Sequence, residues 1–114
     1  LAVRGAAVLN DATLEDAHLA GLDQIVEVID NGSDAPGTIL TECSDEFRKQ
    51  FQSAEVIIAK GQGNFESLAG GPGRIFFLLK VKCPVVAAHT GLATGTHALL
   101  SYRDGEPQGN GRVA

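Results

Sequence analysis

Short apolar segments alternate along this chain with stretches rich in glycine, asparagine and acidic residues. Most of the apolar segments are brief and contain many β-branched residues, a pattern typical of buried strands rather than helices. Strands are predicted at residues 1–3, 24–29, 56–59, 84–88 and 96–102, the last of them at a sheet edge. The apolar run 74–80 fits a strand and a buried helix equally well, so both interpretations stay open.

The sequence between these segments predicts short helices with recognisable ends. Thr13 followed by Asp16 approximates a capping box, and Gly21 suits the C′ position of the same helix. Ser44 and the acidic residues after it are typical of the start of a second helix, which we expect to cover residues 44–52.

Alternating strands and short helices predict an α/β fold with a mostly parallel sheet. The chain has 114 residues, which suffices for one small domain, expected at 1–102. Residues 103–114 are rich in turn-forming and polar residues, and they predict a flexible tail. Leu1 begins a predicted strand, and a parallel strand needs covering layers on both faces. We therefore expect this chain to be the C-terminal part of a longer protein.

Charge and composition narrow the possible functions. The net charge is −5, and no basic stripe is interleaved with aromatic residues, so we expect no nucleic-acid partner. No apolar run approaches the roughly 20 residues that cross a bilayer, and no signal segment begins the chain. Cys43 and Cys83 show no pairing pattern, so we interpret them as thiols of a cytoplasmic protein.

The candidate chemistry lies after the predicted strand 56–59. Lys60, Gly61 and Gly63 follow this strand, and Asn64 is a candidate N-cap for the next helix. Backbone N–H groups, a helix start and an ammonium group at one point favour phosphate or another oxyanion, although an ordinary βα turn gives the same pattern.

Other loops expected at the same edge of the sheet also carry polar groups. Carboxylates and amides come from the early loops, and lysines come from the later ones; the residues are Asn10, Asp11, Asp30, Asn31, Asp34, Lys80 and Lys82. Oxygen ligands beside an anion site suit a hard divalent cation that joins the protein to a phosphate group. We therefore expect a metal-phosphate site at this edge of the sheet, although polar residues also fill ordinary loops.

Four segments, residues 4–17, 32–38, 59–66 and 76–84, resemble motifs of the damage-control phosphatases, a metal-dependent family long catalogued only as a domain of unknown function. The resemblance extends from Leu1 to about His89. It implies a three-layer α/β/α domain that hydrolyses phosphate monoesters of small phosphorylated metabolites. It also implies a bound divalent metal, namely Mn, Ni, Co or Mg.

The same resemblance assigns roles to individual residues. Asp11 matches the metal-binding aspartate of the family, and Lys80 matches a lysine that contacts substrate, with Lys82 as the alternative alignment. The substrate-phosphate loop of the family corresponds to Gly61, Gln62, Gly63 and Asn64. We expect Lys60, Lys80 and these amides to stabilise charge on the phosphoryl oxygens.

One feature of the family pattern is missing from this chain. The family's other two metal ligands form an aspartate-asparagine pair before the strand at Leu1, whereas Asp30 and Asn31 follow the second predicted strand. Activity is therefore expected to need upstream sequence. The alternatives are a binding module for phosphometabolites without hydrolysis, or an inactive fragment, and the oligomeric state stays open.

The remaining basic side chains receive structural interpretations. Arg4 is expected to pair with a carboxylate, in a structural role or near the site. His18 is expected to be solvated on its helix. His89 and His97 lack a partner at metal-ligand spacing.

Overall fold

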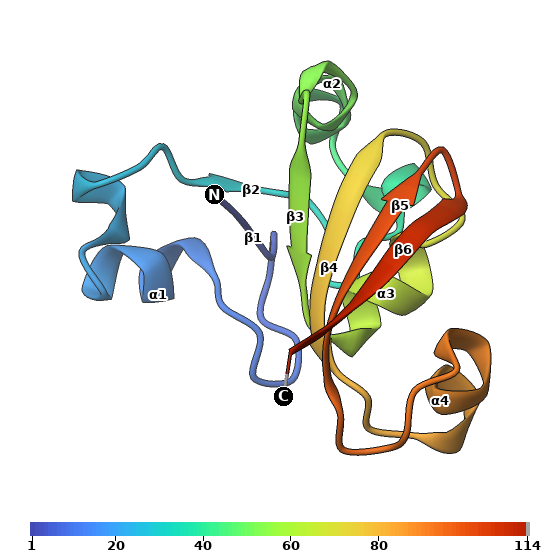
Figure 1. The fold of residues 1–114 in the computed structure, drawn as a ribbon. Coiled ribbons are helices and arrows are strands. Elements are labelled where there is room, and N and C mark those ends of the chain that lie inside the picture. The colour runs from blue at the N-terminus through green and yellow to red at the C-terminus, as the bar shows by residue number, and fades with distance from the viewer. Residues whose placement is uncertain (114) are drawn as a thin grey trace. The chain divides into compact units, whose positions relative to one another are not determined.

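The structure is a computed structural model that describes the backbone of residues 1–113 and the side chains through residue 109 (Figure 1). The chain forms two compact units. The first comprises Leu1–Phe51, and the second begins at Gln52. Each unit is described separately below.

The first unit is built around one short parallel strand pair. Strand β1 (Ala2–Val3) pairs with β2 (Ile29–Asp30), in the register Ala2 to Ile29. Its other elements are α1 (Leu14–Leu19), two single-turn 3-10 helices (Leu22–Gln24 and Leu40–Glu42) and α2 (Asp45–Ser53) as far as Phe51. The strand predicted at residues 1–3 is confirmed, as is the helix predicted from Ser44.

Capping groups fix both ends of α1, as the sequence predicts. The backbone N–H and the hydroxyl of Thr13 each donate to the carboxylate of Asp16, over 2.8 and 2.9 Å. Gly21 follows the helix with a φ of 71°, in the left-handed region that glycine adopts at little cost. At the start of α2, the Ser44 hydroxyl accepts a hydrogen bond from the N–H of Phe47.

The strand predicted at 24–29 is largely wrong. The segment begins inside the 3-10 helix Leu22–Gln24, and only Ile29 of the predicted strand belongs to β2. The partner strand β1 has two residues, so it offers backbone pairing for a strand of that length only. A β-branched run therefore stays outside the sheet.

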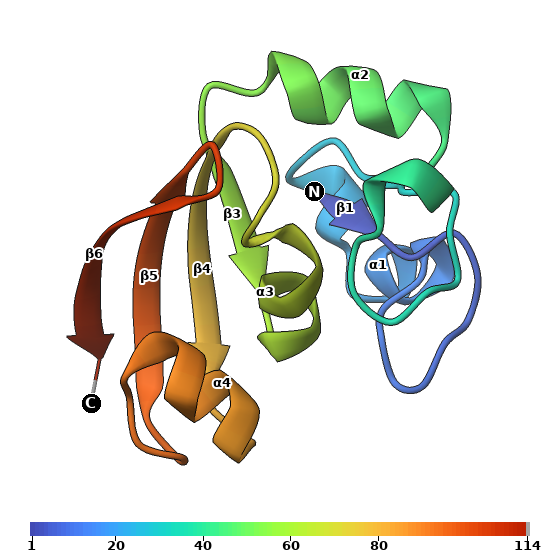
Figure 2. The ribbon, with the colours of Figure 1, turned by 90° about the vertical axis from the view of Figure 1, so that its right-hand side faces the viewer.

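The second unit contains a four-stranded sheet in the order β3-β4-β5-β6. Its elements are β3 (Ile57–Lys60), α3 (Gln62–Leu68), β4 (Arg74–Lys80), α4 (Pro84–Thr90), β5 (His97–Arg103) and β6 (Glu106–Val113). β3 and β4 are parallel, whereas β5 and β6 each pair antiparallel with the preceding strand. In Figure 2 both α3 and α4 lie on the same face of this sheet.

The α/β class expected from the sequence is confirmed, and the ambiguous run 74–80 is the strand β4. A mostly parallel sheet was expected, and the observed pairing is mixed: β1 with β2 and β3 with β4 are parallel, whereas the two pairs of β5 are antiparallel. The strand predicted at 84–88 is wrong, because this segment is the helix α4. Pro84 occupies the first turn of α4, where its missing N–H costs nothing, and Gly91 closes the helix with a φ of 70°.

The C-terminal region also differs from the prediction. A flexible tail is expected from residue 103, and the structure instead places β6 there, beside β5. As a result β5 is an inner strand rather than the predicted edge strand. Asp104 and Gly105, with φ angles of 50° and 83°, form the tight turn between the two strands.

An aromatic cluster fills the covered face of the sheet. Phe77 of β4 is fully buried, and its ring meets Phe65 of α3 and Tyr102 of β5 edge-to-face, at centroid distances of 5.2 and 5.5 Å. The opposite face is more open, since Ile58 and Leu78 are 66% and 39% exposed. The two faces of the sheet thus differ sharply in burial.

Candidate functional site

The carboxyl ends of β3 and β4 lie side by side because these strands are parallel neighbours. Lys60, the last residue of β3, is level with Leu78, and the N–H of Gly61 donates to the Leu78 carbonyl over 2.8 Å. Lys80 lies two positions beyond Leu78, so it projects from the same face as Lys60. Both lysines are exposed. The structure therefore brings together two of the predicted site residues.

Gly61 makes the turn from β3 into α3. Its φ is 90°, and a methyl group at its Cα would meet nothing within 4 Å. The backbone conformation, rather than crowding, is therefore the reason for glycine at this position.

The prediction of Asn64 as N-cap is wrong, because α3 begins at Gln62 and its N-cap is Gly61. Gln62, Gly63 and Asn64 form the first helical turn rather than a loop. The Asn64 side chain donates back to the carbonyl of Lys60 over 2.8 Å. N–H groups in a first turn have no partner within their own helix.

The side chain of Gln62 connects the starts of α3 and α4. Its Oε1 accepts a hydrogen bond from the backbone N–H of Lys82 over 2.8 Å. Its amide nitrogen donates to Glu66 over 2.9 Å and lies 3.5 Å from the sulfur of Cys83. Gln62 therefore holds the segment that follows β4 against the segment that follows β3.

Asp11 belongs to the first unit, where Arg4 holds it. Nε of Arg4 donates to Oδ2 of Asp11 over 2.9 Å, and the guanidinium also donates to the Gly37 carbonyl and the Thr38 hydroxyl. The side chain of Arg4 is 10% exposed, whereas that of Asp11 is 38% exposed. The guanidinium thus joins the loop after β1 to the loop after β2.

The side chains of Asn31 and Asp30 accept hydrogen bonds from backbone N–H groups of nearby loop residues. Asn31 is buried, and its Oδ1 accepts hydrogen bonds from the N–H groups of Gly5 and Ser33, both over 3.0 Å. Asp30 accepts from the N–H of Gly32 over 2.8 Å. These contacts are those of residues that shape loops.

A divalent cation would need more ligands than Asp11 supplies. Among the hydrogen bonds of the described residues, none involves Oδ1 of Asp11, so this oxygen is open to a ligand. Hard cations bind six or more oxygens, several of them from protein. Within residues 1–113, no group of three or more histidine, cysteine, aspartate or glutamate side chains could hold a metal ion. The donor set described here does not make a complete metal site.

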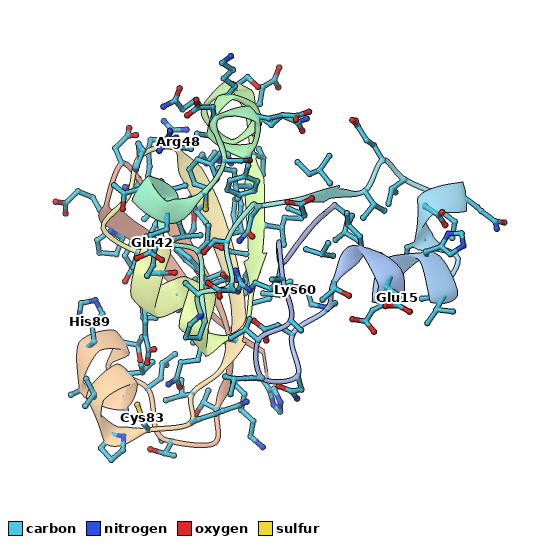
Figure 3. The ribbon with its side chains drawn as sticks, turned by 180° about the vertical axis from the view of Figure 1, so that it is seen from behind. Glu15, Glu42, Arg48, Lys60, Cys83 and His89 are labelled. Carbon is cyan, nitrogen blue, oxygen red and sulfur yellow. The ribbon has the colours of Figure 1, made fainter. Side chains whose placement is uncertain are left out.

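Other titratable groups have pKa values that their surroundings shift. A hydrogen bond to Asp23, 2.7 Å long, raises the pKa of His18 above its usual 6.5 and lowers that of the Asp23 carboxyl. Burial raises the pKa of the Cys43 thiol. Both cysteines are free thiols. Figure 3 shows Cys83 at the start of α4 and His89 farther along this helix.

Comparison with known proteins decides the family. The model of the damage-control phosphatase ARMT1-like domain matches residues 1–98 of the chain. The chain belongs to this phosphatase family. The resemblance of the four sequence motifs is thereby confirmed.

Archaeal proteins are similar to this family member over most of its length. It is 51% identical over 102 residues to the uncharacterised protein MJ0202 of Methanocaldococcus jannaschii. It is 48% identical to the damage-control phosphatase PH1575 of Pyrococcus horikoshii and 45% identical to a damage-control phosphatase of Archaeoglobus fulgidus. These matches cover 86%, 85% and 82% of the chain, but 34%, 33% and 33% of the three relatives. The chain thus spans about a third of their length.

The fold agrees with that of a solved member of the family. The crystal structure of a DUF89 family protein (PH1575) from Pyrococcus horikoshii matches with a TM-score of 0.80 at 45% identity. The match covers 90% of this chain and 36% of that protein. In the part of this chain that the structure describes, no helix has the length and apolar character needed to span a membrane.

Proposed function

We propose that this chain contributes the phosphate-binding edge of a metal-dependent phosphatase acting on small phosphate monoesters, such as sugar phosphates or damaged phosphometabolites. The observation that carries the proposal is the pair of exposed lysines, Lys60 and Lys80, on one face of two parallel strands at their carboxyl ends. Ligands of open α/β sheets bind beyond this end of the strands.

The proposed substrate contacts come from β3, β4 and the start of α3. The ammonium groups of Lys60 and Lys80 would stabilise charge on the phosphoryl oxygens, which is the main demand of phosphoryl transfer. Gly61, Gln62, Gly63 and Asn64 would contribute backbone N–H groups. The side chain of Gln62 already has protein partners, so its proposed contribution is the backbone.

Asp11 is the proposed metal ligand, through the oxygen that Arg4 leaves open. The family resemblance favours Mn, Ni, Co or Mg, and such a cation supplies charge neutralisation when bound. The rest of the ligand set would come from residues beyond this chain, which covers about a third of its relatives. Arg4 would hold Asp11 in place.

The alternative is a module that binds phosphometabolites without hydrolysing them. The incomplete donor set around Asp11 favours this alternative for the chain on its own. The two functions predict the same phosphate binding and differ in turnover. An experiment must therefore measure binding and phosphate release separately.

A chimera tests the proposal. The matching third of the Pyrococcus horikoshii relative is replaced by this chain, and phosphate release is assayed on a sugar-phosphate panel with Mn²⁺, Ni²⁺, Co²⁺ or Mg²⁺. We expect metal-stimulated release that Asp11→Ala abolishes and Lys80→Ala lowers by about 10² to 10³-fold. Lys82→Ala is the matched control for Lys80.

Circular dichroism must show that each chimera is folded. A folded chimera that binds phosphate without releasing it supports the binding module. Release that survives Asp11→Ala removes this residue from the mechanism, and a larger loss with Lys82→Ala than with Lys80→Ala shifts the substrate lysine to residue 82.

A further inference from the structure

His97 lies beside the proposed phosphate-binding lysines. It is the first residue of β5, and the strand register places it directly opposite Lys80 of β4. Directly opposed residues of antiparallel strands project from the same face, with their Cβ atoms about 5 Å apart. His97 is exposed, as Lys80 and Lys60 are. Three adjacent strands thus each contribute one basic side chain to one face.

The local charge contrasts with that of the whole molecule. The chain carries a net charge of −5, whereas β3, β4 and β5 contain no aspartate or glutamate. Lys80 lies opposite His97 on β4, and the backbone register places Val113 of β6 opposite His97 on the other side. Lys60 lies on β3, the other neighbour of β4, and is the third basic side chain of this face. An anion at this edge meets basic groups from all three strands.

His97 differs from the other two histidines in its partners. His18 forms its 2.7 Å pair with Asp23, and the ring of His89 packs against Phe65 at a centroid distance of 5.8 Å. His97 pairs through its backbone within the sheet, and among the described residues its imidazole forms no hydrogen bond or ion pair. Its imidazole is therefore available to a ligand.

We propose that His97 is a further substrate-binding residue, whose imidazole N–H donates to an oxygen of the phosphoryl group held by Lys60 and Lys80. The inference rests on the proposed function, because it uses the same anion at the same edge. A hydrogen bond from the imidazole N–H to a phosphoryl oxygen is charge-assisted, because the acceptor is ionised.

Proton NMR of the imidazole rings tests this directly, since the chain contains three histidines. Inorganic phosphate and phenyl phosphate are titrated into the complete chain while the imidazole signals and backbone amides are followed. We expect both probes to shift the His97 ring signal. The ring signal of His18, which is paired with Asp23, is expected to stay unchanged.

Substitutions supply the second readout. We expect His97→Gln to weaken phosphate binding by about tenfold, because it removes the imidazole N–H from the phosphoryl group. His18→Gln is the matched control and is expected to leave binding unchanged. His97→Lys supplies another hydrogen-bond donor at this position and is expected to restore most of the affinity.

Each outcome separates the two proposals. If phosphate shifts the amides of Lys60, Gly61 and Lys80 but not the His97 ring, His97 is not a ligand and the phosphate edge stands. If phosphate shifts none of these signals, the result contradicts both the proposed phosphate-binding edge and the proposed role of His97. Equal shifts of all three histidines indicate nonspecific binding and also overturn the inference.

Discussion

Arg4 connects two loops of the first unit through one buried guanidinium. It donates to the carboxylate of Asp11, to the Gly37 carbonyl and to the Thr38 hydroxyl. Arginine suits this place because its planar fork reaches several acceptors at once, which the single ammonium of lysine does not. The sequence allowed for a pairing with a carboxylate, and the structure identifies Asp11 as that partner.

We expect Arg4→Met to lower the free energy of unfolding by about 3 kcal/mol, because it leaves buried acceptors and a carboxylate without their donor. Arg4→Lys should recover part of the loss. Urea unfolding of the chain measures both. The matched control is Arg48→Met, because Arg48 pairs with the exposed Asp45 and its loss should cost under about 1 kcal/mol. Equal costs at residues 4 and 48 would show that the Arg4 network contributes little.

At the scale of elements, the loops after β1 and β2 are in direct contact at Gly5. Its N–H donates both to Asn31 Oδ1, over 3.0 Å, and to the Ser33 carbonyl, over 2.9 Å. A Cβ at this position would lie 2.6 Å from the backbone of Gly32 and Ser33. Backbone atoms cannot move aside as the end of a side chain can, so only glycine fits.

Gly5→Ala is therefore expected to destabilise the chain by about 3 kcal/mol, at the upper end for an overpacked site. Gly70→Ala is the matched control, since a Cβ there meets nothing within 4 Å and is expected to change stability by less than about 0.5 kcal/mol. Thermal melts of the two variants compare them. A Gly5→Ala protein as stable as the parent would mean that the loops separate easily.

The elements also show what the sequence can reveal. Helix ends with side-chain caps, such as Thr13 with Asp16, were predictable because the capping groups are local. Helix α4 was missed because an apolar run suits a strand or a helix, although Pro84 at its start and Gly91 at its end mark a helix. Strand β6 lacks the apolar alternation of a strand, and the Asp104-Gly105 turn was its one signal.

At the scale of the whole molecule, the four-stranded sheet buries one face far more than the other. Phe77→Ala is expected to lower the free energy of unfolding by about 3 to 5 kcal/mol, because it empties the centre of the aromatic cluster. Ile58→Ala removes an apolar side chain that is 66% exposed and is expected to cost less than about 1 kcal/mol. Chemical denaturation monitored by circular dichroism gives both values.

If Phe77→Ala and Ile58→Ala lower the free energy of unfolding by similar amounts, the open face is as well packed as the covered face. Phe77→Leu keeps most of the buried volume and serves as a second variant if Phe77→Ala does not fold. The contrast between residues 77 and 58 then remains measurable.

The candidate site was only partly predictable. The proximity of Lys60 and Lys80 was predictable because apolar strands precede them and parallel strands end at one edge. His97 was missed because its relation to Lys80 depends on the register of an antiparallel pair, which single-sequence patterns do not give. The side-chain role of Gln62 was also hidden, since it depends on a partner 20 residues away.

The hydrogen bonds of the Gln62 side chain link the starts of α3 and α4. A single side-chain amide joins the first turn of α3 to the segment at Lys82 and Cys83. Chemical modification of the Cys83 thiol is therefore expected to disturb the start of α3 as well as that of α4.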